Sequence, residues 1–224
     1  MPVVNTLPEF YKLSKMSKQS LKENLMKVHS EIENLRSLWK GPDIPIYIYP
    51  LTKHRPIIDG IEAKKNGVTY NNVIFLFISA ELEAKELTAL LAHEYHHICR
   101  LNYLNKAPQE IELIDSLIIE GMAEWEVEKL YGERWLSPWT KRYSFDEVKA
   151  LWQKSFIPNL HLQGVKNHHS FLYGDEKLGL PRWIGYCLGF RIIESYVNNV
   201  GPIESKFFYQ VSSDKILEGS DFKL

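Results

Sequence analysis

The hydrophobic pattern of the chain begins with a helical stripe. Apolar residues recur at alternating steps of four and three from Leu21 to Trp39, and this spacing predicts an amphipathic helix. Ser20 with Glu23 is typical of a capping box at its start, and the Gly-Pro pair at residues 41–42 is typical of its end. We expect this helix to pack on the core of the chain itself.

Two short apolar segments follow and predict strands. "IPIYIYPL" (residues 44–51) is β-branched and aromatic, and "VIFLFIS" (residues 73–79) reads as a buried strand. Asn66-Gly67, before the second segment, is a good dipeptide for a tight turn. A small sheet is therefore expected in this part of the chain.

The remainder of the chain has helical patterns. One helix is expected from Glu83 to about Leu104, and a second from a first turn at Pro108 to Gly132. Two more are expected, one opened by a Ser-Glu capping box at residues 144–147 and one running from Pro181 to Gly201, with glycines at 185 and 189 for close packing.

This order of elements predicts a mainly helical α+β fold with a small N-terminal β-sheet. We expect a single domain over residues 1–224, in which residues 1–82 hold the first helix and the sheet, and residues 83–224 form the helical part.

Composition and charge exclude several classes of protein. With 45% hydrophobic and 25% charged residues the chain is globular, and a net charge of −1 lacks the basic surplus of a nucleic-acid-binding protein. Its longest apolar run, residues 73–78, is too short for a bilayer, and the first fifteen residues lack the apolar core that a signal peptide would have, so none is expected. Cys99 and Cys187 are too few for a disulfide framework and lie in apolar patterns, so both are expected to be buried. We expect a soluble, cytoplasmic protein with no membrane or nucleic-acid partner.

The stretch "HEYHH" at residues 93–97 carries the candidate chemistry. It matches His-Glu-x-x-His, and helical positions i and i+4 place His93 and His97 on one face, where both imidazoles can bind one Zn²⁺ ion. Glu94 projects about 100° around the helix, which suits a general base for a metal-activated water. His96 is an alternative ligand, although a supporting contact to one of the ligands or packing against neighbours is the favoured interpretation. A solvated polar helix face is the alternative for the whole stretch, but its surroundings are apolar.

Such a site needs a third metal ligand. One zinc class would require Gly and His at positions 100 and 103, which are Arg and Tyr here. Another class uses a glutamate from a second helix, and "LIIEGMAEWEVEKL" supplies Glu120. Glu124 lies one turn further and could accept a hydrogen bond from a ligating histidine. The glycine after Glu120 would let this helix approach the histidine helix closely, whereas Glu126 and Glu128 are expected at the surface.

These residues resemble a known family. The pairing of the histidine motif with a downstream Glu-Gly-x-Ala is similar to gluzincin-type HExxH zinc metallopeptidases. More narrowly, "LLAHEYHH", "LIDSLIIEGMAEW" and "PRWIGYCLGFRII" resemble blocks of the YjaZ-like predicted zinc-dependent proteases, over about residues 89–193. The resemblance implies a zincin-like domain with a zinc cofactor, acting on a peptide or protein substrate. Residues 83–224 would then be the zinc-binding part.

Several further residues are weaker candidates. Peptidases of this type usually need a donor for the oxyanion, and Tyr186 is the first candidate, with an ordinary core tyrosine as the alternative. Arg191 would bind a substrate carboxylate or pair with Glu194, and Asp115 would orient part of the site or fix its helix. A last group lies in a loop that is not expected to reach the site: His168, His169 and Tyr173.

Two other functions compete with a peptidase. A di-iron carboxylate protein would use Glu94-x-x-His97, but it needs a second Glu-x-x-His, and none follows residue 97. A zinc-stabilised binding module without catalysis would use the same ligands, although it has no use for Glu94. The sequence leaves the substrate, the cleavage preference and the oligomeric state open.

Overall fold

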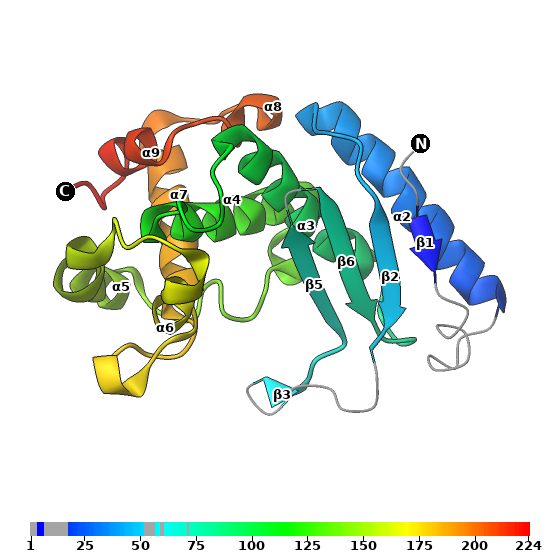
Figure 1. The fold of residues 1–224 in the computed structure, drawn as a ribbon, viewed down its shortest axis with the longest axis horizontal. Coiled ribbons are helices and arrows are strands. Elements are labelled where there is room, and N and C mark those ends of the chain that lie inside the picture. The colour runs from blue at the N-terminus through cyan, green and yellow to red at the C-terminus, as the bar shows by residue number, and fades with distance from the viewer. Residues whose placement is uncertain (1–3, 7–17, 52–56, 59–60, 71) are drawn as a thin grey trace. The chain divides into compact units, whose positions relative to one another are not determined.

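Two compact units make up the chain, residues 1–99 and residues 100–224. The structure is a computed structural model, and it describes residues 4–6, 18–51, 57–58, 61–70 and 72–224 (Figure 1). The first unit holds β1 (Val4–Thr6), α2 (Lys18–Trp39), β2 (Ile46–Pro50), β3 (Ile57–Ile58), β4 (Ile61–Glu62), β5 (Lys65–Tyr70), β6 (Val73–Ile78) and most of α3 (Ala84–Leu104). The second holds α4 (Leu113–Tyr131), α5 (Phe145–Leu151), α6 (His169–Tyr173), α7 (Ile184–Val200), α8 (Ser205–Phe208) and α9 (Ser213–Gly219), with short 3₁₀ and π-helical turns between them.

Strands and helices largely occupy separate parts of the sequence, and the predicted α+β class is confirmed. Among the described residues, no helix is both long enough and apolar enough to cross a membrane. That the chain forms a single domain stays a prediction.

The main sheet of the first unit has the strand order β1-β2-β6-β5. The first three strands in this order are parallel, and β5 runs antiparallel to β6. Side chains alternate across the sheet: Ile46, Ile48, Ile74 and Leu76 are buried on one face. The opposite face carries stacked aromatic pairs, such as Tyr47–Phe75 with ring centroids 5.4 Å apart. This alternation is why both apolar segments form strands, as predicted.

The turn expected at Asn66-Gly67 is wrong, because both residues lie inside β5. Six residue pairs join β5 to β6, from Lys65↔Ile78 to Tyr70↔Val73. The chain therefore reverses after Tyr70, and the ladder of strand pairs outweighs the local turn preference of the dipeptide.

Helix α2 buries four residues of the predicted stripe: Val28, Ile32, Leu35 and Trp39. Its end at Trp39 agrees with the prediction, but it begins at Lys18, before the proposed capping box. Within the first unit the Trp39 ring stacks on Tyr95 of α3 at 5.9 Å, and the Tyr95 hydroxyl donates to the carbonyl of Pro42 at 2.8 Å. These contacts join α2 to α3.

Helix α4 begins at Leu113 rather than at Pro108. Glu112 and Asp115 form a capping box there, and the backbone N–H groups of Leu113 and Ile114 donate to carbonyls of the 160–162 segment. The start of α4 thus depends on carbonyl groups some fifty residues further along the chain, which accept hydrogen bonds from the free N–H groups of its first turn. By contrast, the local capping box of Ser144 and Glu147 at the start of α5 is confirmed.

Helices α4 and α7 form the centre of the second unit (Figure 1). A Cβ on Gly121 would overlap the backbone of Gly189, and a Cβ on Gly189 would overlap the carbonyl of Leu117. The prediction that Gly189 serves close packing is confirmed. Gly121 was expected to let α4 approach the histidine helix closely, but the groups that a Cβ there would meet belong to Gly189 and Ile193 of α7, so this glycine serves the contact with α7. Buried apolar side chains surround this contact, among them Leu117, Ile118, Met122, Leu188, Ile192 and Ile193.

Candidate metal centre

Two imidazoles lie one turn apart on α3. The rings of His93 and His97 have centroids 4.5 Å apart and are nearly perpendicular, at 77°. His97 is buried and His93 is partly buried. The helix runs unbroken from Ala84 to Leu104, as the sequence predicts, so the i, i+4 geometry of the motif is present.

Glu94 is buried against strand β5 and only 6% exposed. The hydroxyl of Thr69 donates to its Oε2 atom at 2.6 Å. On the same strand, Gly67 lies so close that a Cβ there would overlap the carboxylate. The carboxylate is therefore held by two residues that the sequence did not single out.

Helix α4 carries the two predicted glutamates. Glu120 is partly buried, and Glu124 is 3% exposed. The Glu124 carboxylate accepts hydrogen bonds from the backbone N–H of Ser137 at 2.9 Å, from the Ser137 hydroxyl at 2.7 Å and from the Thr140 hydroxyl at 3.0 Å. These bonds tie the segment after α4 to the helix, one turn beyond Glu120. The interaction of Glu124 with a ligating histidine stays a prediction.

Among the described residues, His93, His97 and Glu120 form a group that could hold a metal ion. Each offers one ligand atom, and these atoms lie within 4.8 Å of one another. The donor set of two imidazoles and one carboxylate fits Zn²⁺, which binds such nitrogen and oxygen atoms at about 2.0–2.2 Å and leaves a position open in hydrolytic sites.

His96 has different surroundings from the two candidate ligands, His93 and His97. It is 0% exposed, and its ring packs edge-on against Trp39 with centroids 5.2 Å apart. This contact agrees with the packing role that the sequence analysis favoured.

Tyr186 lies in an aromatic cluster of the second unit. Its ring is 5.7 Å from Trp139, 5.5 Å from Trp183 and 5.3 Å from Tyr173, measured between centroids. Trp139 stacks on Trp183 at 4.5 Å, and Trp183 has a left-handed φ of 64° at the start of α7. The tyrosine is half-buried, and its role in oxyanion binding stays a prediction.

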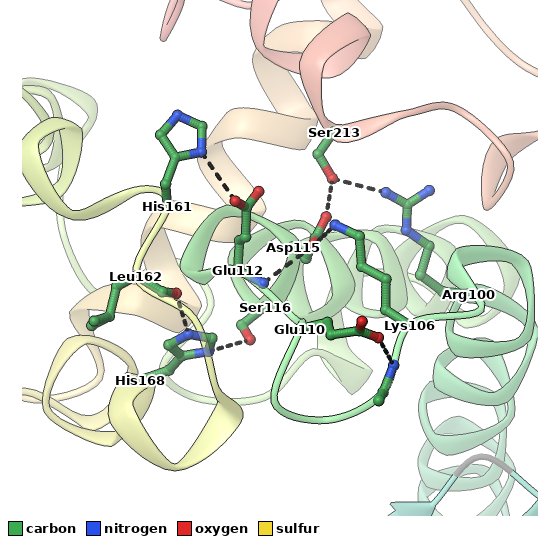
Figure 2. A network of polar contacts seen from close by, with 11 residues as sticks. Arg100, Lys106, Glu110, Glu112, Asp115, Ser116, His161, Leu162, His168 and Ser213 are labelled. Atoms are coloured by element: carbon green, nitrogen blue, oxygen red, sulfur yellow. Dashed lines mark hydrogen bonds and ion pairs between the residues drawn. The ribbon is translucent and has the colours of Figure 1, made fainter.

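The other weak candidates have structural partners. Asp115 accepts hydrogen bonds from Lys106 at 2.6 Å and from Ser213 at 2.8 Å, and it also caps α4, so it fixes its helix (Figure 2). Arg191 pairs with Glu194 at 2.7 Å.

The segment expected as a loop is helical, since His168 ends a short 3₁₀ turn and His169 begins α6. His168 is 0% exposed and hydrogen-bonded to Ser116 (Figure 2). His169 is exposed and stacks on Tyr173 with ring centroids 4.6 Å apart. His168 therefore belongs to the core of its own unit.

Glu126 was expected at the surface, but it is 1% exposed. It accepts a hydrogen bond from the hydroxyl of Ser205 at 2.7 Å, and Lys129 lies 3.4 Å away. A buried carboxylate needs such partners. Since Ser205 lies 79 residues further along the chain, no local pattern could have predicted this hydrogen bond to the buried carboxylate.

The two cysteines are free and buried, as predicted. Burial raises the pKa of Cys99 to about 12, and it also raises the pKa of Cys187. Both side chains are therefore protonated thiols at neutral pH.

The sequence analysis missed Thr69, Gly67, Ser137 and Thr140. Thr69 and Gly67 contact the predicted base, and the other two contact Glu124. The one available signal is that Gly67 and Thr69 are two residues apart, so they share a face if the segment is a strand. The apparent turn at Asn66-Gly67 hid that signal.

The site combines a His-Glu-x-x-His helix with a group of two histidines and one glutamate that suits a single ion. These features place the chain among proteins with a possible zinc-type metal centre. Residues 25–218 match a family described as "Predicted Zn-dependent protease (DUF2268)", and the chain belongs to this family.

Two relatives come from Bacillus subtilis (strain 168). YjaZ is 32% identical over 173 residues, which are 76% of this chain and 65% of YjaZ. YjfC is 26% identical over 121 residues, which are 50% of this chain and 40% of YjfC. The matched part of the chain thus spans less than two thirds of the length of either relative.

Proposed function

We propose that this protein is a zinc-dependent peptidase of the gluzincin type, with a zincin-like arrangement around its histidine helix. The observation that carries the proposal is the group of His93, His97 and Glu120, whose ligand atoms lie within 4.8 Å of one another, next in sequence to a buried glutamate. Membership of the predicted zinc-dependent protease family supports the same class. The substrate would be a peptide or a protein.

His93, His97 and Glu120 would bind the zinc ion. A bound zinc ion would supply Lewis-acid chemistry, lowering the pKa of a water ligand and polarising the carbonyl of the scissile bond. Glu124, held by Ser137 and Thr140, would orient one of the ligating histidines by accepting its second ring N–H.

Glu94 would be the general base. Its carboxylate would take a proton from the attacking water and return it to the leaving amine nitrogen, with no covalent intermediate on the protein. The burial of Glu94 supports this role, because a carboxylate with restricted freedom loses little entropy when it reaches the geometry for proton transfer. Tyr186 would donate a hydrogen bond to the oxyanion.

Strand β5 would hold the substrate in an extended form. Strand β6 is unsuited to this role, because it pairs with β2 on one side and with β5 on the other. Among the described strands, β5 pairs with β6 alone and is an end of the sheet. An extended peptide could add to this edge by backbone hydrogen bonds.

Glu94→Gln tests the proposal. The variant keeps the shape of the side chain but is not a base, so we expect one zinc ion per chain to remain, while kcat on a peptide library falls about 10²- to 10⁴-fold. Metal content is measured by elemental analysis and hydrolysis by mass spectrometry of the cleaved peptides. Glu218→Gln, at an exposed position of α9, is the matched control and should keep both properties.

Different outcomes would point to different functions. Equal activity in Glu94→Gln would remove the proposed base. Zinc and peptide binding by the unaltered protein without any hydrolysis would indicate a binding module, and a pair of iron ions per chain would indicate a di-iron protein.

A further inference from the structure

Strand β5 carries a hydroxyl that bonds directly to the candidate base. We propose that Thr69 is a positioning residue for Glu94, and that Gly67 provides the space in which the carboxylate lies. The inference rests on the proposed function, because it assigns a role to Thr69 in the proton transfer that Glu94 would perform.

The first support is the geometry of the hydroxyl. Thr69 Oγ1 lies 2.6 Å from Oε2 of Glu94 and 3.1 Å from the backbone carbonyl oxygen of the same residue. A hydroxyl has one proton, and the carboxylate oxygen, which lies at the shorter distance, is the stronger acceptor. The hydroxyl therefore donates to the carboxylate.

The second support is the rigidity of the strand. Thr69 pairs with Ile74 of β6 and Gly67 pairs with Leu76, and both partners are 0% exposed. A shift of the strand by one residue would turn this buried face outward, so the register is strongly fixed. Threonine is also stiff at χ1 because it is β-branched. The donor is thus already in position before any substrate arrives.

The third support is the space at Gly67. A Cβ at this position would overlap the carboxylate of Glu94, its Cδ and its Cγ. Gly67 and Thr69 lie on the same face of β5, so one residue admits the carboxylate and the other holds it. The bond to Thr69 uses one of about four lone-pair sites of the carboxylate. The remaining sites can still accept a proton from water.

Thr69→Val is the main test, since valine keeps the shape and β-branching of threonine without the hydroxyl. We expect kcat to fall about 10- to 100-fold, as for a small misplacement of a catalytic group, with KM and zinc content unchanged. Thr69→Ser restores a hydroxyl and should recover most of kcat. Thr88→Val, which removes a hydroxyl bonded to the Lys85 carbonyl on α3, is the matched control and should behave like the unaltered protein.

A structural measurement separates this inference from the proposed function. In crystal structures of the zinc-loaded protein, Thr69→Val should move the Glu94 carboxylate away from its position beside β5, and Thr69→Ser should not. Gly67→Ala should also displace the carboxylate, because the added methyl group would overlap its Oε1 atom. These structures show whether Thr69 positions the Glu94 carboxylate even if the unaltered protein cleaves no peptide. Such a lack of cleavage would overturn the peptidase proposal but not the contact between Thr69 and Glu94.

Three results would overturn the role of Thr69. The first is a kcat of Thr69→Val equal to that of the unaltered protein. The second is a loss that Thr69→Ser does not restore. The third is a Glu94 carboxylate in the same position in the Thr69→Val crystal.

Discussion

At the scale of single residues, His168 illustrates how a buried polar group is satisfied. Its Nε2 atom lies 2.8 Å from the carbonyl oxygen of Leu162, and its Nδ1 atom lies 2.8 Å from the hydroxyl of Ser116 (Figure 2). A carbonyl only accepts, so Nε2 carries a proton and donates it to Leu162. Burial lowers the pKa of the ring below 6.5, although the bond to Leu162 and the charge of Asp115 oppose this shift. Burial therefore favours the neutral ring, in which Nδ1 accepts from the hydroxyl of Ser116.

This environment predicts that the free energy of unfolding decreases as the pH is lowered. Because the folded pKa of His168 lies below its value of 6.5 in the unfolded chain, the unfolded chain binds the proton more tightly. The contribution of His168 is present above pH 6.5 and is lost as the pH falls below it. Urea unfolding of the metal-free protein at pH 7.5 and 5.5 should show a larger loss for the unaltered protein than for His168→Gln. His161→Gln, at an exposed position, is the control, and equal losses for all three proteins would contradict the prediction.

At the scale of elements, the contact of α4 with α7 depends on glycine. Gly121 and Gly189 face each other, and Gly189 also approaches the carbonyl of Leu117. Alanine would favour each isolated helix by about 1 kcal/mol. The surrounding core is closely packed, however, so the backbone cannot withdraw without cost. Overlap with the backbone carbonyl of Leu117 therefore makes alanine at position 189 destabilising.

Gly189→Ala should lower the free energy of unfolding by about 1–3 kcal/mol, the usual cost of overpacking a core. Urea denaturation measures the change. Asn198→Ala, at an exposed position of the same helix, gains helix propensity without the overlap and should keep or slightly raise the free energy of unfolding. A variant of Gly189 that is as stable as the unaltered protein would show that α4 and α7 can separate freely.

At the scale of the whole molecule, a polar network fixes the C-terminal segment within the second unit. Arg100 is 0% exposed and donates to the carbonyls of Tyr209 at 2.8 Å and Val211 at 2.6 Å and to the hydroxyl of Ser213 at 3.0 Å. Ser213 in turn donates to Asp115 (Figure 2). Burial lowers the pKa of Arg100 to about 10, while the charge of Asp115 opposes the shift. The network connects residues more than a hundred positions apart.

Zinc should stabilise the folded protein as a whole. A ligand that binds only the folded state adds RT ln(1 + [L]/Kd), which is about 2.7 kcal/mol at a concentration of 100 Kd. We expect a chelator to lower the melting temperature, and added zinc to restore it, in differential scanning calorimetry. His97→Ala should abolish the zinc-dependent part. A melting temperature that responds to neither treatment would contradict zinc binding by the folded chain.

The sequence by itself determined the features that depend on neighbours along the chain. The helix of His93, Glu94 and His97 followed from an unbroken apolar pattern, and the capping box at Ser144 followed from residues three positions apart. The strands at residues 46–50 and 73–78 followed from their side-chain pattern. Interactions between adjacent turns or residues are sufficient for such elements.

Only the tertiary structure decided which distant groups meet. The contacts of Thr69 with Glu94 and of Gly121 with Gly189, and the burial of Glu126, depend on strand register and on how the elements pack. The same applies to the start of α4, where backbone carbonyls of Leu160 and Leu162 accept hydrogen bonds from the first N–H groups of the helix. Packing selects these contacts by shape and by the need of buried polar groups for partners, and neither is visible in one stretch of sequence.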